Sequence, residues 1–239
     1  MADTRTINEG TFRIVLAGDY ILRPSMLVRI RNMVLTARRK LAQVVTLTGQ
    51  SQHEAFRACM GAYFRVPAAV GLADYNRWVI RLVGSLRELN NHLQSPELTI
   101  HSAIGQHEGM EDAAAYVMRN DYLGTLRDMA GFADPHSRAG YHSDIYMNFD
   151  ALTTNDVAAA NLVHEASHRY LGARDWAYLP NYDMISYVTQ WAALNVPVPF
   201  PPRSRNALKA WADMTVDEAL NNADSYAGFV SRFRIPLAP

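Results

Sequence analysis

Hydrophobic and polar residues alternate along the first part of the chain with the period of amphipathic helices. Between residues 24 and 46 apolar side chains recur at helical spacing with arginines between them, and Pro24 stands where a helix begins. Residues 51–64 predict a second helix with Ser51 as its N-terminal cap. Residues 74–94 predict a third helix. Its apolar stripe consists of Trp78, Val79, Leu82, Leu86 and Leu89.

Shorter segments follow, and their patterns are more varied. Residues 97–103 predict a short strand, whereas residues 110–120 fit either a helix or irregular structure. Residues 131–144 are rich in glycine, small polar residues and Asp-Pro, which is typical of turns. In residues 145–152 apolar positions alternate with others, which predicts a strand. We expect this strand to form an edge of a sheet, where an extended peptide can pair with it.

A further helix is predicted after this strand, with Thr153 and Asp156 resembling a capping box at its start. Alanines fill its interior, and Gly172 stands where a helix C-cap belongs. Downstream, residues 181–195 predict another helix and residues 196–205 form a proline-rich loop. Residues 206–233 predict one or two closing helices.

These patterns predict an α+β fold that is mostly α-helical, with a small sheet. The chain has 239 residues, of which 49% are hydrophobic, so it can bury a sizeable core. We expect a single domain over residues 1–239. Residues 1–95 would form an N-terminal helical half, and residues 96–239 a half that carries the functional site.

The charge and cysteine content exclude several classes of protein. The chain has 23 basic and 23 acidic residues, so its balance gives no electrostatic footprint for nucleic acid or an anionic membrane. We therefore expect neither as a partner. The one cysteine, Cys59, excludes an internal disulfide. The first 20 residues lack a secretory signal, so we expect a soluble protein made in the cytoplasm. Export by a specialised secretion system stays open.

The sequence HEASH at residues 164–168 carries the chemistry of the chain. Residues four apart lie on one face of a helix, so His164 and His168 can both direct an imidazole nitrogen at one metal ion. Glu165 is turned about 100° around the helix axis and can reach a water on that ion without ligating it. This is the spacing of H-E-x-x-H, in which the glutamate is a general base.

A catalytic zinc usually has three protein ligands, so a third ligand is needed. No histidine follows His168, and no glutamate lies between Glu165 and Glu218. The first carboxylate after the helix is Asp175, and a chain reversal at Gly172 could return it to the metal. The simpler interpretation of these residues is a pair of surface histidines and an aspartate that caps a turn. A chance H-E-x-x-H has roughly a one in a hundred probability in such a chain.

With these residues in view, the segment resembles the aspzincin metallopeptidases, which include deuterolysin and peptidyl-Lys metalloendopeptidase. Their pattern is H-E-x-x-H followed by G-T-x-D-x-x-Y-G, and here HEASH is followed by GARDWAYL. Gly172, Asp175 and Tyr178 fall in the family's register, whereas Ala173 and Leu179 depart from it. The resemblance implies that Asp175 is the third zinc ligand and that Tyr178 stabilises the oxyanion of the reaction.

A second match is NNADSYAGF at residues 221–229, which is similar to the family's closing N-A-D-x-x-x-x-F segment. It implies that Asp224 lies at the S1′ pocket, where it can meet a basic side chain. Strictly lysine-specific members have a glutamate where this chain has Ala227, so we expect a mild preference for Lys or Arg after the cut. The absence of disulfides departs from the secreted fungal members and suggests a bacterial-type relative.

The expected function is therefore that of a zinc-dependent endopeptidase acting on peptides or proteins, with Glu165 as general base and Tyr178 as a helper. A metzincin would need a histidine as third ligand at a different spacing, and a gluzincin would need Glu218. Three alternatives stay open. The protein could be a toxin or effector peptidase with an immunity or inhibitor protein as partner, a non-catalytic zinc-binding module, or a hydrolase of a non-peptide amide.

Overall fold

The computed structural model describes residues 4–18, 20–103, 115–117, 144–152, 154–177 and 210–232. The helices in these ranges are α1 (Pro24–Leu47), α2 (Glu54–Phe64), α3 (Leu72–Gln94), α5 (Asn155–Ala166), α7 (Val216–Ala219) and α8 (Ala223–Arg232). The strands are β1 (Thr4–Asn8), β2 (Arg13–Ala17), β3 (Thr99–Ser102), β4 (Ala115–Val117) and β5 (Ile145–Met147). Helices dominate and the strands form one small mixed sheet, which confirms the predicted mostly helical α+β class.

The three N-terminal helices lie where the hydrophobic pattern predicts them. α1 begins at Pro24, whose fixed φ suits the first turn of a helix and whose missing N–H is not needed there. On α3 the apolar stripe is buried from Val79 to Leu89. The predicted cap of α2 is wrong, because the helix begins later than Ser51. Nδ1 of His53 accepts a hydrogen bond from the Ala55 N–H at 3.1 Å and caps the first turn.

The sheet has the strand order β1-β2-β3-β5-β4, and its first two strands are an element that the sequence reading missed. β1 and β2 form an antiparallel hairpin, with Gly10 at a φ of +78° in its turn. β2 presents Ile14 and Leu16 to the core at 0% exposure, whereas Arg13, Val15 and Ala17 are half-buried. Burial alternates over these five residues, but Val15 and Ala17 are apolar too, so the sequence itself shows no alternation of hydrophobic and polar residues.

The expectation that residues 145–152 form a sheet edge is wrong. β5 pairs in parallel with β3 on one side and antiparallel with β4 on the other, so it lies inside the sheet. Among the described strands, the edge next to β5 is β4, which lies within residues 110–120, where the sequence analysis left helix or irregular structure open. A strand of three residues is too short to leave a periodic pattern, and pairing with β5 decides its conformation.

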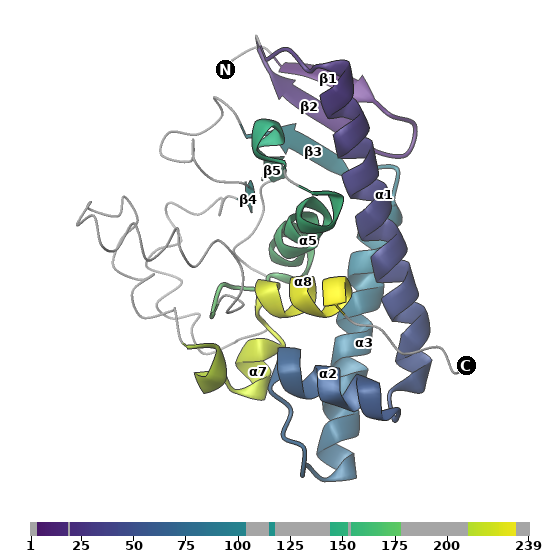
Figure 1. Cartoon of the computed structure of the whole chain (residues 1–239), viewed down its shortest axis with the longest axis vertical. Helices are drawn as coiled ribbons and strands as arrows, with labels where there is room; N and C mark the ends of the chain where they lie inside the picture. The colour runs from purple at the N-terminus through teal and green to yellow at the C-terminus, as the bar shows by residue number, and fades with distance from the viewer. Residues whose placement is uncertain are drawn as a thin grey trace, which may run out of the picture.

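α5 lies at the centre of the molecule (Figure 1). It packs against α1 and α8, and it also contacts the strands β4 and β5. It begins one residue later than predicted, since the Oγ1 atom of Thr154 accepts the hydrogen bond from the Val157 N–H. The consecutive alanines at positions 158–160 are buried. They lie on successive faces of α5, and their small side chains allow the neighbouring elements to pack closely against the helix.

One hydrophobic cluster takes side chains from both halves of the chain. Phe64 of α2 packs edge-on against Tyr226 and Phe229 of α8, with ring centroids 5.5 and 5.3 Å apart. Phe56 of α2 meets Phe229 at 5.7 Å. The aromatic contacts fix α8 against the N-terminal helices. Residues 131–143 of the predicted turn, the helix at 181–195 and the loop at 196–205 lie outside the described residues.

Candidate metal centre

The candidate centre begins at the C-terminal end of α5. His164 lies in the last turn of α5, and His168 lies in a π-helical turn, Ser167–Leu171, that continues the helix. Gly172 ends this turn with a φ of +64°, which confirms the predicted glycine C-cap. Glycine reaches this left-handed conformation without steric cost, and the chain reverses there. The reversal returns Asp175 to the two histidines.

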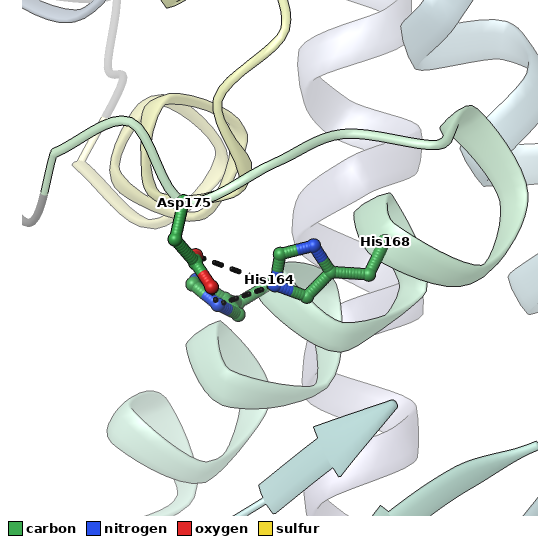
Figure 2. Close-up of side chains that lie close together, drawn as sticks. All are labelled: His164, His168 and Asp175. Carbon is green, nitrogen blue, oxygen red and sulfur yellow. Dashed lines mark hydrogen bonds and ion pairs between the residues drawn. The ribbon is translucent and has the colours of Figure 1, made fainter. Parts of the chain in front are cut away.

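Three side-chain atoms converge on one point. Nε2 of His164 and Nε2 of His168 are 3.0 Å apart, and Oδ1 of Asp175 is 3.3 Å from the first and 3.4 Å from the second. Figure 2 shows the three side chains turned toward one another, with Asp175 arriving from the segment that follows the helix. The atoms thus form a nearly equilateral triangle from two residues of one helix face and one residue of the returning chain.

The size of this triangle fits one tetrahedral metal ion. Two ligand atoms at about 2.0–2.1 Å from such an ion lie about 3.3–3.4 Å apart. The observed separations are 3.0 to 3.4 Å. Both histidines are buried and Asp175 is half-buried, and the group can hold a metal ion.

The other nitrogen of each imidazole has an acceptor. Nδ1 of His164 lies 2.7 Å from Oδ1 of Asp224, and Nδ1 of His168 lies 2.8 Å from the carbonyl oxygen of Ala173. A carboxylate and a carbonyl only accept hydrogen bonds, so both Nδ1 atoms carry the proton. The two Nε2 lone pairs therefore face each other and the Asp175 carboxylate. Such convergence is unfavourable unless a cation lies between them, and orienting partners of this kind are usual at metal sites.

The electrostatics of the cluster also favour a cation. Burial opposes the charged form of His164, but the carboxylates of Asp175 and Asp224 outweigh it and raise the pKa of His164 well above its ordinary value. Burial likewise opposes the charged form of His168, and Asp175 raises the pKa of His168. Burial would raise the pKa of Asp175, but His168 and His164 hold it well below its ordinary value. A metal ion can take the place of the protons that the metal-free histidines attract.

Glu165 is buried beside this group, with 5% of its surface exposed. Its Oε2 atom has no hydrogen-bond partner among the described residues. Burial raises the pKa of Glu165, and the carboxylates of Asp175 and Asp224 act in the same direction against the opposite effect of the histidines. A carboxylate with a raised pKa is a stronger base than an exposed one, so Glu165 has the properties of a general base.

Asp224 lies in the first turn of α8, with 1% of its surface exposed, and its carboxylate contacts His164. Its part in orienting His164 was missed by sequence reasoning, because the two residues are 60 positions apart and meet only through the packing of α5 on α8. The role at the S1′ pocket that the resemblance implies stays a prediction.

The structure describes one of the two remaining sequence candidates, Glu218. Oε2 of Glu218 accepts from the N–H and the hydroxyl of Thr215 in the capping box of α7. Glu218 is not part of the group that can hold a metal, so the gluzincin arrangement gains no support. Tyr178 lies outside the described residues, and its predicted role in catalysis stays a prediction.

The sequence matches no protein-family model, and no curated protein is similar to it at a significant level. The similarity to aspzincins therefore rests on the residues quoted above. In the described part of the chain, no helix combines the length and the apolar character needed to cross a membrane.

Proposed function

We propose that the protein is a zinc-dependent endopeptidase of the aspzincin type, with His164, His168 and Asp175 as the zinc ligands. The observation that carries the proposal is the convergence of three ligand atoms within 3.4 Å of one another, with both imidazole Nδ1 atoms bound to acceptors. Such an arrangement orients two lone pairs and one carboxylate at a single ion.

The choice of zinc rests on the ligands and on the buried glutamate beside them. Two imidazoles and a carboxylate suit zinc, and the same set also occurs in non-haem iron oxygenases. Glu165 favours hydrolysis, because a hydrolytic zinc site needs a general base next to the metal. Its buried Oε2 atom, without a partner among the described residues, fits a group that meets water or substrate during the reaction.

The residues of the chain divide the work of peptide hydrolysis. Bound zinc supplies a Lewis acid that polarises the scissile carbonyl and makes a water more acidic. Glu165 accepts a proton from the attacking water and delivers it to the leaving amine. Asp224 and the Ala173 carbonyl keep the two imidazoles oriented. Tyr178 donates a hydrogen bond to the oxyanion, as the resemblance implies.

An extended peptide would bind along the edge strand β4. Among the described residues β4 pairs with β5 alone, and it also contacts α5, the helix that carries His164 and Glu165. An unpaired strand edge offers main-chain hydrogen bonds to an added strand, which would lay the substrate beside the metal centre. We further propose that α5 and this sheet form a zincin-like catalytic core.

The test combines metal analysis with digestion of a peptide library by the wild type, Glu165→Gln and Glu218→Gln. We expect about one zinc per chain in all three. Glu165→Gln should lose at least about 10²–10⁴-fold in cleavage rate, since it removes the base and leaves the ligands. Glu218→Gln is the matched control, because Glu218 caps α7 and is not part of the group that can hold a metal, and it should cleave like the wild type.

Three results would contradict the proposal. Metal-loaded wild type that cleaves no peptide or protein would point to a binding module. Glu165→Gln that cleaves as fast as the wild type would remove Glu165 from the reaction. Iron in place of zinc would favour the oxygenase class over hydrolysis.

A further inference from the structure

We propose that Asn222 is a positioning residue that sets the place of Asp175, the third ligand of the candidate centre. This inference rests on the metal site of the proposed function and adds a residue outside its ligands. Asn222 lies at the junction of α7 and α8, with 0% of its surface exposed. Asn222 is far from Asp175 in sequence, and its side chain bonds to Trp176 and Ala177, which directly follow Asp175.

The side chain of Asn222 binds the main chain directly after Asp175. Its Oδ1 atom accepts from the Trp176 N–H at 2.8 Å and from the Ala177 N–H at 3.2 Å. Its Nδ2 atom donates to the Ala177 carbonyl at 3.0 Å and to the Ser225 hydroxyl at 3.2 Å. A primary amide offers two donors and two acceptor lone pairs, so these contacts use its full capacity.

The main chain directly before Asp175 is held to the same junction. The Arg174 N–H donates to the Asn221 carbonyl at 2.8 Å, and the Ala223 N–H donates to the Arg174 carbonyl at 3.0 Å. These bonds form a short parallel bridge between Arg174 and Asn222. Asp175 is thus the residue between a main-chain bridge on one side and the Asn222 amide on the other.

This arrangement explains why an irregular segment can supply a metal ligand. A carboxylate on a free loop would lose conformational entropy on binding the ion, whereas a fixed main chain presents it in advance. The same junction carries Asp224, which contacts His164. The junction of α7 and α8 therefore supports one histidine ligand directly and the aspartate ligand through Asn222.

Neither alanine nor aspartate fills this position equally well. Alanine would leave the Trp176 and Ala177 N–H groups without their acceptor. Aspartate keeps the volume and the acceptor oxygen, but it places a second oxygen against the Ala177 carbonyl, where Asn222 donates. Asn222→Asp should therefore fold and still misplace the segment, which makes it a useful second variant.

The test measures zinc affinity by chelator competition for wild type, Asn222→Ala and Asn222→Asp. We expect affinity to fall about 10–100-fold, as for other outer-shell residues of metal sites. The control is Tyr226→Phe on α8, which removes a buried hydrogen bond to the Leu220 carbonyl that does not involve the segment of Asp175. Its melting temperature should fall, and its zinc affinity should stay within about 2-fold of the wild type.

The decisive step repeats Asn222→Ala in an Asp175→Ala background. If Asn222 acts through Asp175, the protein with Asp175→Ala has no carboxylate for Asn222 to position. Adding Asn222→Ala to it should then change zinc affinity by less than about 3-fold. A visible absorption spectrum of the Co²⁺-loaded protein adds a direct readout. The spectrum of Asn222→Ala should shift toward that of Asp175→Ala.

The outcomes separate this inference from the proposed function. Unchanged zinc affinity in both Asn222 variants would overturn the positioning role and leave the metal site intact. The same loss with and without Asp175 would overturn it too, because Asn222 would then act on the fold in general. A wild type that binds no zinc would contradict the proposed function and this inference together.

Discussion

At the scale of single residues, the centre depends on which imidazole nitrogen carries the proton. An imidazole that donates from Nδ1 has its lone pair on Nε2, and the Nε2 atoms of His164 and His168 are the atoms that meet Asp175. For His168 the acceptor is the Ala173 carbonyl, in the turn that Gly172 allows. For His164 it is Asp224 on a different helix. A local turn and a distant helix thus orient the two imidazoles independently.

The first prediction concerns Asp224. Asp224→Asn keeps the size of the side chain but weakens the acceptor for the His164 Nδ1–H, so zinc affinity should fall about 10–100-fold in a chelator competition. Asp213→Asn is a suitable control, because Asp213 is exposed. A variant with unchanged zinc affinity but an altered preference for Lys or Arg after the cut would contradict this role. It would support the place at the S1′ pocket instead.

The site residues also show which contacts can be predicted from local sequence and which cannot. His164, Glu165, His168 and Asp175 fall within 12 positions, so helix geometry and one glycine turn are enough to predict that they meet. The contacts made by Asn222 and Asp224 depend on packing between segments more than 40 positions apart. The N-A-D sequence marks these residues, but only the fold shows what they touch.

At the scale of elements, long periodic segments were predictable and short ones were not. α1 and α3 span more than 20 residues each, and a stripe of that length identifies a helix by itself. β4 and β5 have three residues each, and their conformation depends on their partners in the sheet. For the same reason, the sequence could not show that β5 lies inside the sheet and β4 at its edge.

The second prediction concerns the contact of α8 with α2. Phe229 is 0% exposed and meets Phe64 at 5.3 Å and Phe56 at 5.7 Å. Phe229→Ala should lower the free energy of unfolding by about 3–5 kcal/mol, because it removes buried apolar area and leaves a cavity. Urea denaturation measures this. Val157→Ala, at a position that is 42% exposed, should cost less than about 1 kcal/mol. A similar cost for both variants would mean that α8 is not part of the core.

At the scale of the whole molecule, the candidate centre joins parts of the chain that the sequence separates. α5 carries His164 and packs against α1 from the N-terminal half and against α8 near the other end. The segment of Asp175 is bonded to the junction of α7 and α8. A metal ion bound at the centre would therefore stabilise the fold as well as supply its chemistry.

The third prediction is that the rise in melting temperature caused by zinc grows between about pH 6 and pH 8. The pKa values of His164 and His168 are raised in the metal-free protein. Their protonation stabilises that state fully below the unfolded value of about 6.5, and this stability is lost as pH rises through the folded pKa. Zinc replaces those protons, so the stabilisation of the fold by zinc increases with pH. A zinc-induced rise in melting temperature that is constant or becomes smaller from pH 6 to pH 8 would contradict this prediction.

The most direct measurement of the central claim is the X-ray absorption spectrum at the zinc edge of protein loaded with one equivalent of zinc. We predict an inner shell of nitrogen and oxygen atoms at about 2.0–2.1 Å with the outer-shell signature of two imidazoles. His168→Ala should lose one imidazole from that shell. A shell without imidazole, or one unchanged by His168→Ala, would show that zinc binds elsewhere and would contradict the account.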